Sequence, residues 1–204
     1  MISAVILAAG RSQRMGRPKM ALPWGDTTVI GQVVQTLVQA EVKDILVVTG
    51  GYHQEVESAL QGLPVRVVYN PRFAEGEMVS SLQTGLANLP EAADAALVVL
   101  GDQPKIQAHV VSGVIAMYRA QHADLVVPSY QMRRGHPWLI DRRLWGEVQA
   151  LGVQHTLRDL LQAHASEILY LPVETDSVLI DLDTPGDYER ERPKDENPRL
   201  PGLG

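Results

Sequence analysis

The chain has 204 residues, of which 45% are hydrophobic, 21% are charged and none is cysteine, a composition typical of one globular domain. The lack of cysteine excludes disulfides, thiolate zinc sites and a cysteine nucleophile. The 24 acidic residues outnumber the 18 basic ones, and the net charge of −6 argues against duplex nucleic acid as a partner. The longest apolar runs, 2–9 and 95–100, are far shorter than the ~20 residues that span a bilayer, and no signal peptide is visible. We therefore expect a cytoplasmic protein that binds neither nucleic acid nor a membrane.

Strand-like and helix-like patterns alternate along the chain. Short continuous apolar runs predict strands, and apolar residues spaced three or four apart predict helices. Thr27 or Thr28 can cap the first helix, and the run Asp183-Thr184-Pro185 can cap the last. In chain order, the patterns predict strand 4–7, helix 29–38, strand 45–48, helix 53–60, strand 65–69, helix 79–89, strand 95–100, helix 110–118, strands 125–127 and 138–140, helix 156–163, strands 168–171 and 178–182, and helix 185–192.

The order of these elements predicts the fold class. The strands are continuously apolar, which is typical of strands buried on both faces. Joined by helices, they predict an α/β fold of three layers, α/β/α, with a mostly parallel, Rossmann-like sheet. Residues 1–192 are expected to form a single domain. The tail 193–204 is polar and rich in glycine and proline, and it is predicted to be disordered.

A cationic loop follows the first predicted strand. In open α/β sheets, ligands bind at the carboxyl ends of strands, and small residues such as those at 8–10 let backbone N–H groups approach a ligand closely. The loop therefore suits a polyphosphate, although it is neither a Walker A loop nor a GxGxxG fingerprint. A surface loop with solvated charges is the alternative. Four cations lie within nine residues of this otherwise acidic chain: Arg11, Arg14, Arg17 and Lys19.

The segment 7–19 reads Leu-Ala-Ala-Gly-x-Ser-x-Arg-Met-Gly-x-x-Lys. It resembles the signature of nucleotidyltransferases with the molybdenum cofactor guanylyl/cytidylyltransferase-like fold, and so implies a sheet of the nucleotide-diphospho-sugar transferase type. In this family the loop wraps the triphosphate of a nucleotide. The resemblance implies catalytic roles for Lys19, which neutralises phosphate charge, and for Arg14, which stabilises the pyrophosphate leaving group. It implies nucleotide contacts for Leu7, Ala8, Ala9, Gly10, Arg11 and Ser12.

Two acidic positions are candidates for a metal. Mg²⁺ prefers hard oxygen ligands and usually takes one or two carboxylates together with phosphates and water. Asp102 lies two residues after the end of the strand 95–100, and capping of the next helix is the alternative role for it. Asp181 and Asp183 alternate along a segment predicted to be extended, so only one of them is expected to face the site.

The resemblance implies which carboxylates bind the metal. The family holds Mg²⁺, for which Mn²⁺ can substitute, at an aspartate in Gly-Asp-x-Pro and at one in Asp-Thr-Pro. These motifs correspond to Asp102, which is implied to be catalytic and to contact the nucleotide as well, and to Asp183. We therefore expect Asp181 to face solvent or to be structural. Plain capping of the last helix is the alternative for Asp183.

Two further segments resemble molybdenum cofactor cytidylyltransferases: 70–82, with Asn-Pro, Gly and Ser-Ser, and the Gly-His-Pro at 135–137. The resemblance implies a nucleotide-binding half, 1–128, and an acceptor-binding half, 129–192. A helix start without a ligand is the alternative for the Ser-Ser pair, and a plain turn is the alternative for the histidine. The implied nucleotide contacts are Asn70, Gly76, Ser80 and Ser81, and the implied acceptor contacts are Gln103, Pro104, Gly135, His136 and Pro137.

The implied activity is transfer of CMP from CTP to the phosphate of the molybdopterin cofactor, with release of pyrophosphate. Ala9 favours CTP, because Ala-Ala-Gly accompanies cytidylyl transfer in this family and Ala-Gly-Gly accompanies guanylyl transfer. A molybdoenzyme, or its maturation chaperone, would be the partner that receives the product. Two alternatives stay open: transfer to a sugar or alcohol phosphate or from GTP, and a non-catalytic nucleotide- and cofactor-binding chaperone for a molybdoenzyme.

Overall fold

The computed structural model describes residues 1–75 and 78–194. Gly76 and the tail 195–204 lie outside the described residues, so the nucleotide contact expected of Gly76 and the disorder expected of the tail stay predictions. No helix in 1–75 or 78–194 is long and apolar enough to cross a membrane. The strands are β1 (Ile2–Ala8), β2 (Pro23–Trp24), β3 (Thr27–Thr28), β4 (Asp44–Thr49), β5 (Arg66–Tyr69), β6 (Ala95–Leu100), β7 (Leu125–Tyr130), β8 (Arg133–Arg134), β9 (Trp138–Asp141) and β10 (Ile168–Pro172). The helices are α1 (Val29–Gln39), α2 (His53–Ala59), α3 (Val79–Ala87), α4 (Ala108–Gln121), α5 (Trp145–Ala150), α6 (Leu157–Ala163) and α7 (Pro185–Glu191), with 3₁₀ turns η1 (Lys19–Ala21), η2 (Arg142–Leu144) and η3 (Asp176–Leu179).

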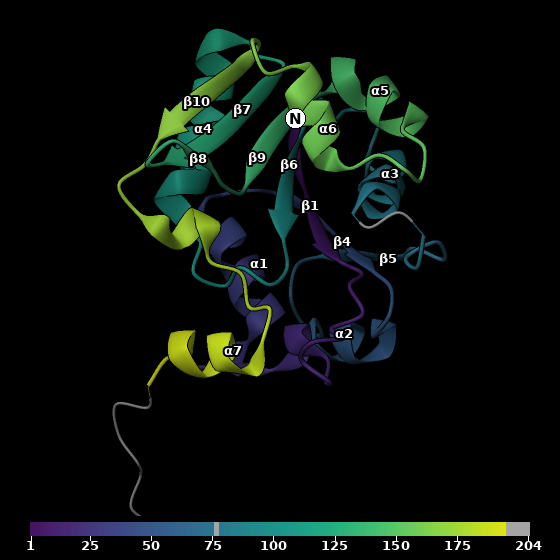
Figure 1. Cartoon of the computed structure of the whole chain (residues 1–204), viewed down its shortest axis with the longest axis vertical. Helices are drawn as coiled ribbons and strands as arrows, with labels where there is room; N and C mark the ends of the chain where they lie inside the picture. The colour runs from purple at the N-terminus through teal and green to yellow at the C-terminus, as the bar shows by residue number, and fades with distance from the viewer. Residues whose placement is uncertain (76–77, 195–204) are drawn as a thin grey trace, which may run out of the picture.

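A mostly parallel sheet forms the centre of the molecule, in the order β10-β7-β9-β6-β1-β4-β5, with β8 paired to β7 (Figure 1). Strand β1 pairs in parallel with both β4 and β6, so that Leu7 lies opposite Val48 on one side and Leu100 on the other. The predicted three-layer α/β class is confirmed. Strand β9 is antiparallel to β6 and β7, a direction that an apolar run alone does not encode.

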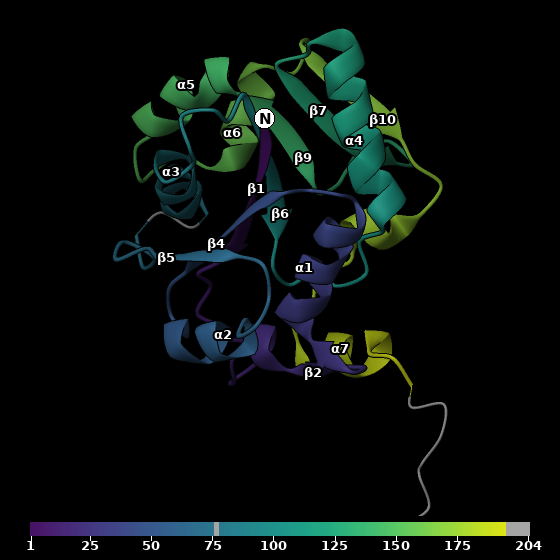
Figure 2. The same ribbon diagram turned by 180° about the vertical axis from the view of Figure 1, so that it is seen from behind.

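Helices cover both faces of the sheet, as the opposite views in Figures 1 and 2 show. Alternate residues of β1 point to opposite faces, and both sets are apolar, which is why the strand is buried on both sides. Ala4 and Ile6 join one core with α1, α2 and α4, whereas Val5 and Leu7 join the other with α3, α5 and α6.

The order of the strands creates a crevice at one edge of the sheet. The chain runs from β1 outward to β4 and β5, then returns to β6 on the other side of β1. The segments that follow β1 and β6 therefore diverge, and such switch points are where open α/β sheets bind ligands.

The segment 178–182, predicted to be a strand, is not one. Thr175 accepts a hydrogen bond from the Ser177 N–H and starts the 3₁₀ turn η3, which is followed by irregular chain. Val178 is buried against Gly135, where a Cβ would lie only 2.6 Å from the Val178 Cβ, and its carbonyl accepts a hydrogen bond from the His136 N–H at 2.9 Å. The apolar residues of this segment are thus buried by packing against a loop rather than by pairing in the sheet.

Candidate nucleotide-binding site

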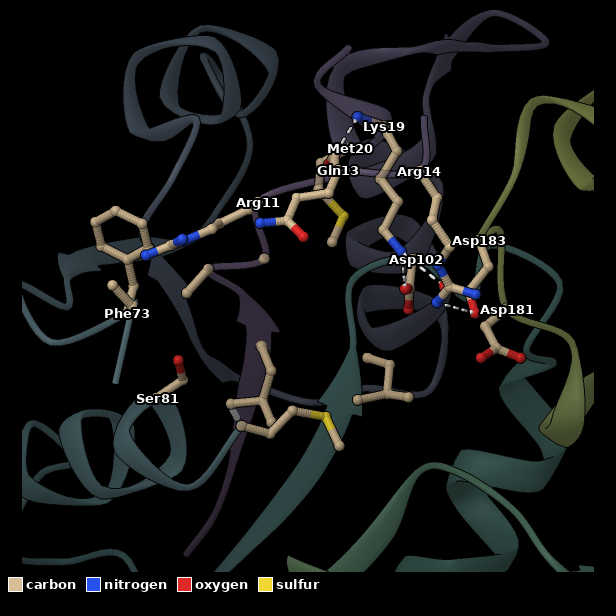
Figure 3. A pocket seen from close by; sticks show the side chains of 17 residues that line it. Arg11, Gln13, Arg14, Lys19, Met20, Phe73, Ser81, Asp102, Asp181 and Asp183 are labelled. Carbon is tan, nitrogen blue, oxygen red and sulfur yellow. Dashed lines mark hydrogen bonds and ion pairs between the residues drawn. The ribbon is translucent and has the colours of Figure 1, made fainter. Parts of the chain in front are cut away.

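A cavity of about 600 Å³ opens at the carboxyl edge of β1 and β6 (Figure 3). We call it the edge cavity. It combines the loop after β1, the start of α3, the end of β6 and the segment before α7. The predicted site residues that line it are Leu7, Ala9, Gly10, Arg11, Ser12, Arg14, Lys19, Ser81, Asp102 and Asp183.

The signature loop, residues 9–19, curls on itself beside β4. The N–H groups of Met15 and Gly16 both donate to the Ser12 carbonyl at 3.0 Å. Gly50, which follows β4, allows the loop to approach closely, because a Cβ there would lie 2.6 Å from the Ala9 carbonyl oxygen. The absence of a side chain at Gly50 therefore determines where the first residues of the loop lie.

A charge cluster of Arg14, Lys19, Asp102 and Asp183 lies at one end of the edge cavity. Lys19 Nζ is 2.5 Å from Asp102 Oδ2 and 3.3 Å from Asp183 Oδ1, and Arg14 Nη2 is 2.8 Å from Asp183 Oδ2. Burial alone would lower the pKa of Lys19, but its pairing with the two carboxylates outweighs burial and raises the pKa above the usual 10.5. Lys19 is therefore a permanent cation between two carboxylates from distant parts of the chain.

Asp181 is exposed to solvent, as expected, but it also lines the edge cavity, so the prediction that only one of Asp181 and Asp183 faces the cavity is wrong. The alternation rule requires a strand, and this segment is irregular. Leu182, between the two aspartates, is buried, and its N–H donates to the Asp102 carbonyl at 3.0 Å. Burial and the charges of Asp102 and Asp183 raise the pKa of Asp181.

The carboxylates fit a metal that arrives with a triphosphate rather than a metal held by protein alone. Within 1–75 and 78–194, no three acidic, histidine or cysteine side chains are arranged to hold a metal ion. Asp102 and Asp183 offer hard oxygen atoms and already hold one cation, the Lys19 ammonium, between them. Mg²⁺ usually takes one or two carboxylates and completes its shell with phosphates and water, so this donor set fits it.

The opposite end of the edge cavity is aromatic and less charged. The Arg11 guanidinium lies 5.6 Å from the centre of the Phe73 ring, and Figure 3 shows Ser81 on the same side. Phe73 packs at 6.3 Å from Tyr69, between ring centres. Phe73 is the chain's single phenylalanine and lies in the segment 70–82, but nothing in the motif marked it. The lining residues that sequence reasoning did not single out are Gln13, Met20, Phe73, Ala74, Met78 and Leu100.

Several predicted site residues lie outside the lining of the edge cavity. Asn70 is fully buried, and its amide donates to the hydroxyls of Ser80 and Ser81 at 3.0 and 3.1 Å while its oxygen accepts from the Arg72 N–H. Asn70 thus fastens the start of α3 to the end of β5. The others outside the lining are Ala8, Ser80, Gln103, Pro104, Gly135, His136 and Pro137.

The Gly-His-Pro segment directly precedes β9, whose first residue, Trp138, pairs with Val98 of β6. The N–H groups of Gly135 and His136 donate to the carbonyls of Pro128 and Val178, at 2.8 and 2.9 Å. Burial lowers the pKa of His136 to about 4, so its imidazole is neutral at pH 7. The His136–Pro137 peptide bond is cis.

Comparison with known proteins agrees with the signature. A family model described as a MobA-like NTP transferase domain matches residues 4–168. The chain is 31% identical over 150 residues to nicotine blue oxidoreductase of Paenarthrobacter nicotinovorans, covering 70% of this chain and 72% of that protein. It is 24% identical over 189 residues to molybdenum cofactor cytidylyltransferase of Escherichia coli, covering 92% of this chain and 93% of that protein.

Solved structures share the fold over nearly the whole chain. The crystal structure of Rv0371c from Mycobacterium tuberculosis H37Rv superimposes with a TM-score of 0.82 at 30% identity, covering 93% of this chain and 96% of that one. A structure of the same protein in complex with manganese superimposes with a TM-score of 0.76 at 31% identity, with the same coverage. The chain therefore belongs to the nucleotidyltransferase family with the MobA-like NTP transferase domain, as the signature at 7–19 predicted.

Proposed function

We propose that this protein transfers CMP from CTP to the phosphate group of molybdopterin and releases pyrophosphate. The observation that carries the proposal is the charge cluster. Lys19 and Arg14 of the signature loop meet two carboxylates at the carboxyl edge of the sheet, the arrangement that a metal–triphosphate complex needs. The full-length similarity to the cytidylyltransferase of Escherichia coli supports the choice of reaction.

In this reaction, a phosphate oxygen of the acceptor attacks the α-phosphorus of CTP in line. The bond between that phosphorus and the bridging oxygen of the β-phosphate breaks, and pyrophosphate leaves with the bonding electrons. The acceptor phosphate is already anionic, so no general base is required. The chain's contribution is positioning and charge neutralisation, which dominate phosphoryl-type transfer.

Each residue of the charge cluster has a separate proposed role in positioning or neutralising the phosphate groups. Lys19 lies at the base of the loop and neutralises charge on the triphosphate, and Arg14 stabilises the leaving pyrophosphate. Asp102 and Asp183 would hold Mg²⁺, or Mn²⁺ in its place, and the metal would supply further neutralisation of the phosphate oxygens. Backbone N–H groups of residues 9–12 complete the phosphate-binding surface.

The aromatic end of the edge cavity is the proposed base-binding end. Ala9 is buried there, and a Cβ at Gly50 would lie 2.8 Å from the Ala9 Cβ and 2.6 Å from the Phe73 Cβ. The Ala9 methyl group therefore takes up space near the wall that Phe73 forms. Less room at this end favours a pyrimidine over a purine, which supports CTP rather than GTP.

His136 and its neighbours, at the start of β9, are proposed to contact the acceptor. A neutral imidazole offers one donor and one acceptor rather than a positive charge. His136 is therefore better suited to a neutral polar part of the acceptor, such as a pterin edge, than to its phosphate.

A fold does not determine which reaction an enzyme catalyses, and one relative of this chain is named as an oxidoreductase. The proposed reaction therefore needs a direct assay.

The decisive assay incubates the protein with Mg²⁺ and one α-³²P-labelled nucleotide: CTP, GTP, ATP or UTP. Each nucleotide is tested with molybdopterin, with a sugar phosphate and without an acceptor. We expect label to enter the molybdopterin product from CTP, with one pyrophosphate released for each label transferred. Asp102→Asn is the inactive control, and Asp26→Asn, which removes an exposed carboxylate outside the cavity lining, is its matched partner.

Other outcomes of the assay would identify other functions. Transfer from GTP, or to a sugar phosphate alone, would replace the substrate in the proposal. Nucleotide binding without pyrophosphate release would favour the chaperone alternative. Oxidation of NADH or NADPH with an added dye, in a protein that releases no pyrophosphate, would favour a redox enzyme.

A further inference from the structure

A small apolar cluster lies beneath the signature loop, separate from the two cores of the sheet. It contains residues from the loop, from the β2–β3 hairpin, from the start of α1 and from the C-terminal segment. Leu182, between the two cavity aspartates, belongs to it as well. We call it the anchoring cluster, and its members are Met15, Leu22, Trp24, Val29, Leu182 and Tyr188.

Tyr188 on α7 contacts three residues between positions 17 and 24. Its ring packs against Trp24 with 6.4 Å between ring centres, and its hydroxyl donates to the Pro23 carbonyl at 2.7 Å. The Arg17 guanidinium lies 5.6 Å from the centre of the same ring. Arg17 thus binds Tyr188 instead of lining the edge cavity, unlike the other three cations of the loop.

Helix α7 is itself firmly held. Thr184 and Asp187 form a capping box at its start, and Lys105 pairs with Glu191 at 2.7 Å near its end. Asp183 directly precedes the capping residue, so the position of α7 and the position of that carboxylate are linked. Figures 1 and 2 both show α7 against the lower edge of the molecule, on the side of the first loop. The helix lies beyond residues 4–168, which the family model matches.

We propose that Tyr188 is a positioning residue that holds the signature loop, so that Arg14 and Lys19 face Asp183 and Asp102. Its hydroxyl fixes the chain at Pro23, just after η1, and its ring holds Arg17 on the outer side of the loop. The two contacts flank Lys19 in sequence. Without them, the segment 11–19 would keep its own turn at Ser12 and its ion pairs with Asp183 but lose its attachment to α7.

Trypsin tests this anchoring without any ligand. Arg11, Arg14 and Lys19 are cleavage sites within the loop, whereas Arg17 precedes Pro18, a bond that trypsin does not cut. The exposed Arg158 on α6 serves as an internal reference for general loosening of the protein. The measurement is the initial rate of cleavage in the loop divided by the rate at Arg158, by mass spectrometry, for the wild type, Tyr188→Phe, Tyr188→Leu and Glu189→Gln.

We expect this ratio to rise about fivefold in Tyr188→Phe, which loses one hydrogen bond, and further in Tyr188→Leu, which also loses the ring. Glu189→Gln, an exposed position on the same helix, should match the wild type. An unchanged ratio in both Tyr188 variants would overturn the proposal. A rise in cleavage at every site equally would also overturn it, because Tyr188 would then only stabilise the fold.

A second readout rests on the proposed function. The dissociation constant of CTP with Mn²⁺, measured by calorimetry well below the melting temperature, should rise about fivefold in Tyr188→Phe and stay unchanged in Glu189→Gln. An unchanged constant in both Tyr188 variants would show that the loop is held elsewhere when nucleotide binds, and would overturn the positioning role. If the wild type bound no nucleotide while the cleavage ratio still rose, the anchoring would stand and the proposed function would fail.

Discussion

The loop after β1 and the loop before β9 lie at the same edge of the sheet, but the first carries charged side chains and the second carries a neutral histidine. The first presents paired charges: Lys19 is held as a cation by Asp102 and Asp183. The second presents an imidazole that burial keeps neutral, and its backbone N–H groups are used internally, His136 to Val178 and Gly135 to Pro128. The difference divides this edge by charge, into a charged end at Lys19 and a neutral end at His136, and this supports the proposal that the first binds polyphosphate and the second binds the rest of the acceptor.

The largest expected effect comes from the charged end. Asp102→Asn removes a carboxylate proposed to hold the metal, and we expect kcat for transfer to fall by about 10²–10³. Because asparagine has nearly the same shape as aspartate, and Asp183 still pairs with Lys19, the fold should survive. Pyrophosphate release at saturating CTP measures kcat, and circular dichroism checks the fold. A kcat within twofold of the wild type would remove Asp102 from the site.

Lys19→Met should separate two roles of the same cation. It should lower kcat/KM for the nucleotide by about 10²-fold, because the triphosphate loses a neutralising charge. It should also raise the affinity for Mn²⁺ in the absence of nucleotide, by about tenfold, because Asp102 and Asp183 are left without their ammonium partner. Electron paramagnetic resonance of free Mn²⁺ measures the second effect. A weaker Mn²⁺ affinity in the variant would contradict the view that one cation can replace the other.

The neutral end can be tested through the pH dependence of stability. The pKa of His136 is about 4 in the folded protein and 6.5 in the unfolded chain, so the unfolded state binds the proton more tightly. Its contribution is constant above pH 6.5, and the free energy of unfolding should fall by up to about 3 kcal/mol as the pH drops from 6.5 toward 4. His136→Gln should lose this part of the acid sensitivity in urea titrations. An imidazole that titrates near pH 6.5 by NMR would break the contrast between the two loops.

His164, on neither of these loops, should have a smaller effect of opposite sign on the pH dependence of the free energy of unfolding. His164 pairs with Glu167 at 2.8 Å and with Glu147 at 2.7 Å, and these carboxylates raise its pKa above the usual 6.5. This stabilisation is complete below pH 6.5 and is lost as the pH rises through the raised pKa. We expect an effect of less than about 1 kcal/mol on the free energy of unfolding, since the two glutamate side chains are each 54% exposed to solvent. His164→Gln should abolish this loss of stability above pH 6.5, whereas an identical slope in the variant would assign the loss to other groups.

Most of the fold could be predicted from the sequence, because the apolar residues of the strands are also the buried ones. Runs such as 4–7 and 95–100 are apolar on both faces, and Thr28 and Thr184 cap α1 and α7 as their hydroxyls predict. The direction of β9 could not be predicted, since an apolar run is equally compatible with either orientation. The segment 178–182 was misjudged because its burial depends on Gly135, more than 40 residues earlier.

The charged end of the site was easier to predict than the rest. Lys19, Arg14, Asp102 and Asp183 belong to motifs, and the structure brings all four together. Phe73 and Tyr188 act through tertiary contacts that leave no local pattern, so the sequence alone did not mark their positions. The acceptor roles of Gln103, Pro104 and 135–137 stay predictions.

The central claim is that the edge cavity binds a nucleoside triphosphate together with a divalent metal. Lys19 is proposed to contact the triphosphate and Asp102 to hold the metal. The most direct measurement is thermal denaturation of the wild type and Asp102→Asn with MgCl₂ and each of CTP, GTP, ATP and UTP. Ligand at about 100 times its dissociation constant adds about 2.7 kcal/mol, a rise in melting temperature of roughly 5–10 °C for a chain of this size. We predict this rise for the wild type with CTP, dependent on Mg²⁺ and absent in Asp102→Asn. No rise with any of the four nucleotides, or an equal rise in Asp102→Asn, would contradict the claim.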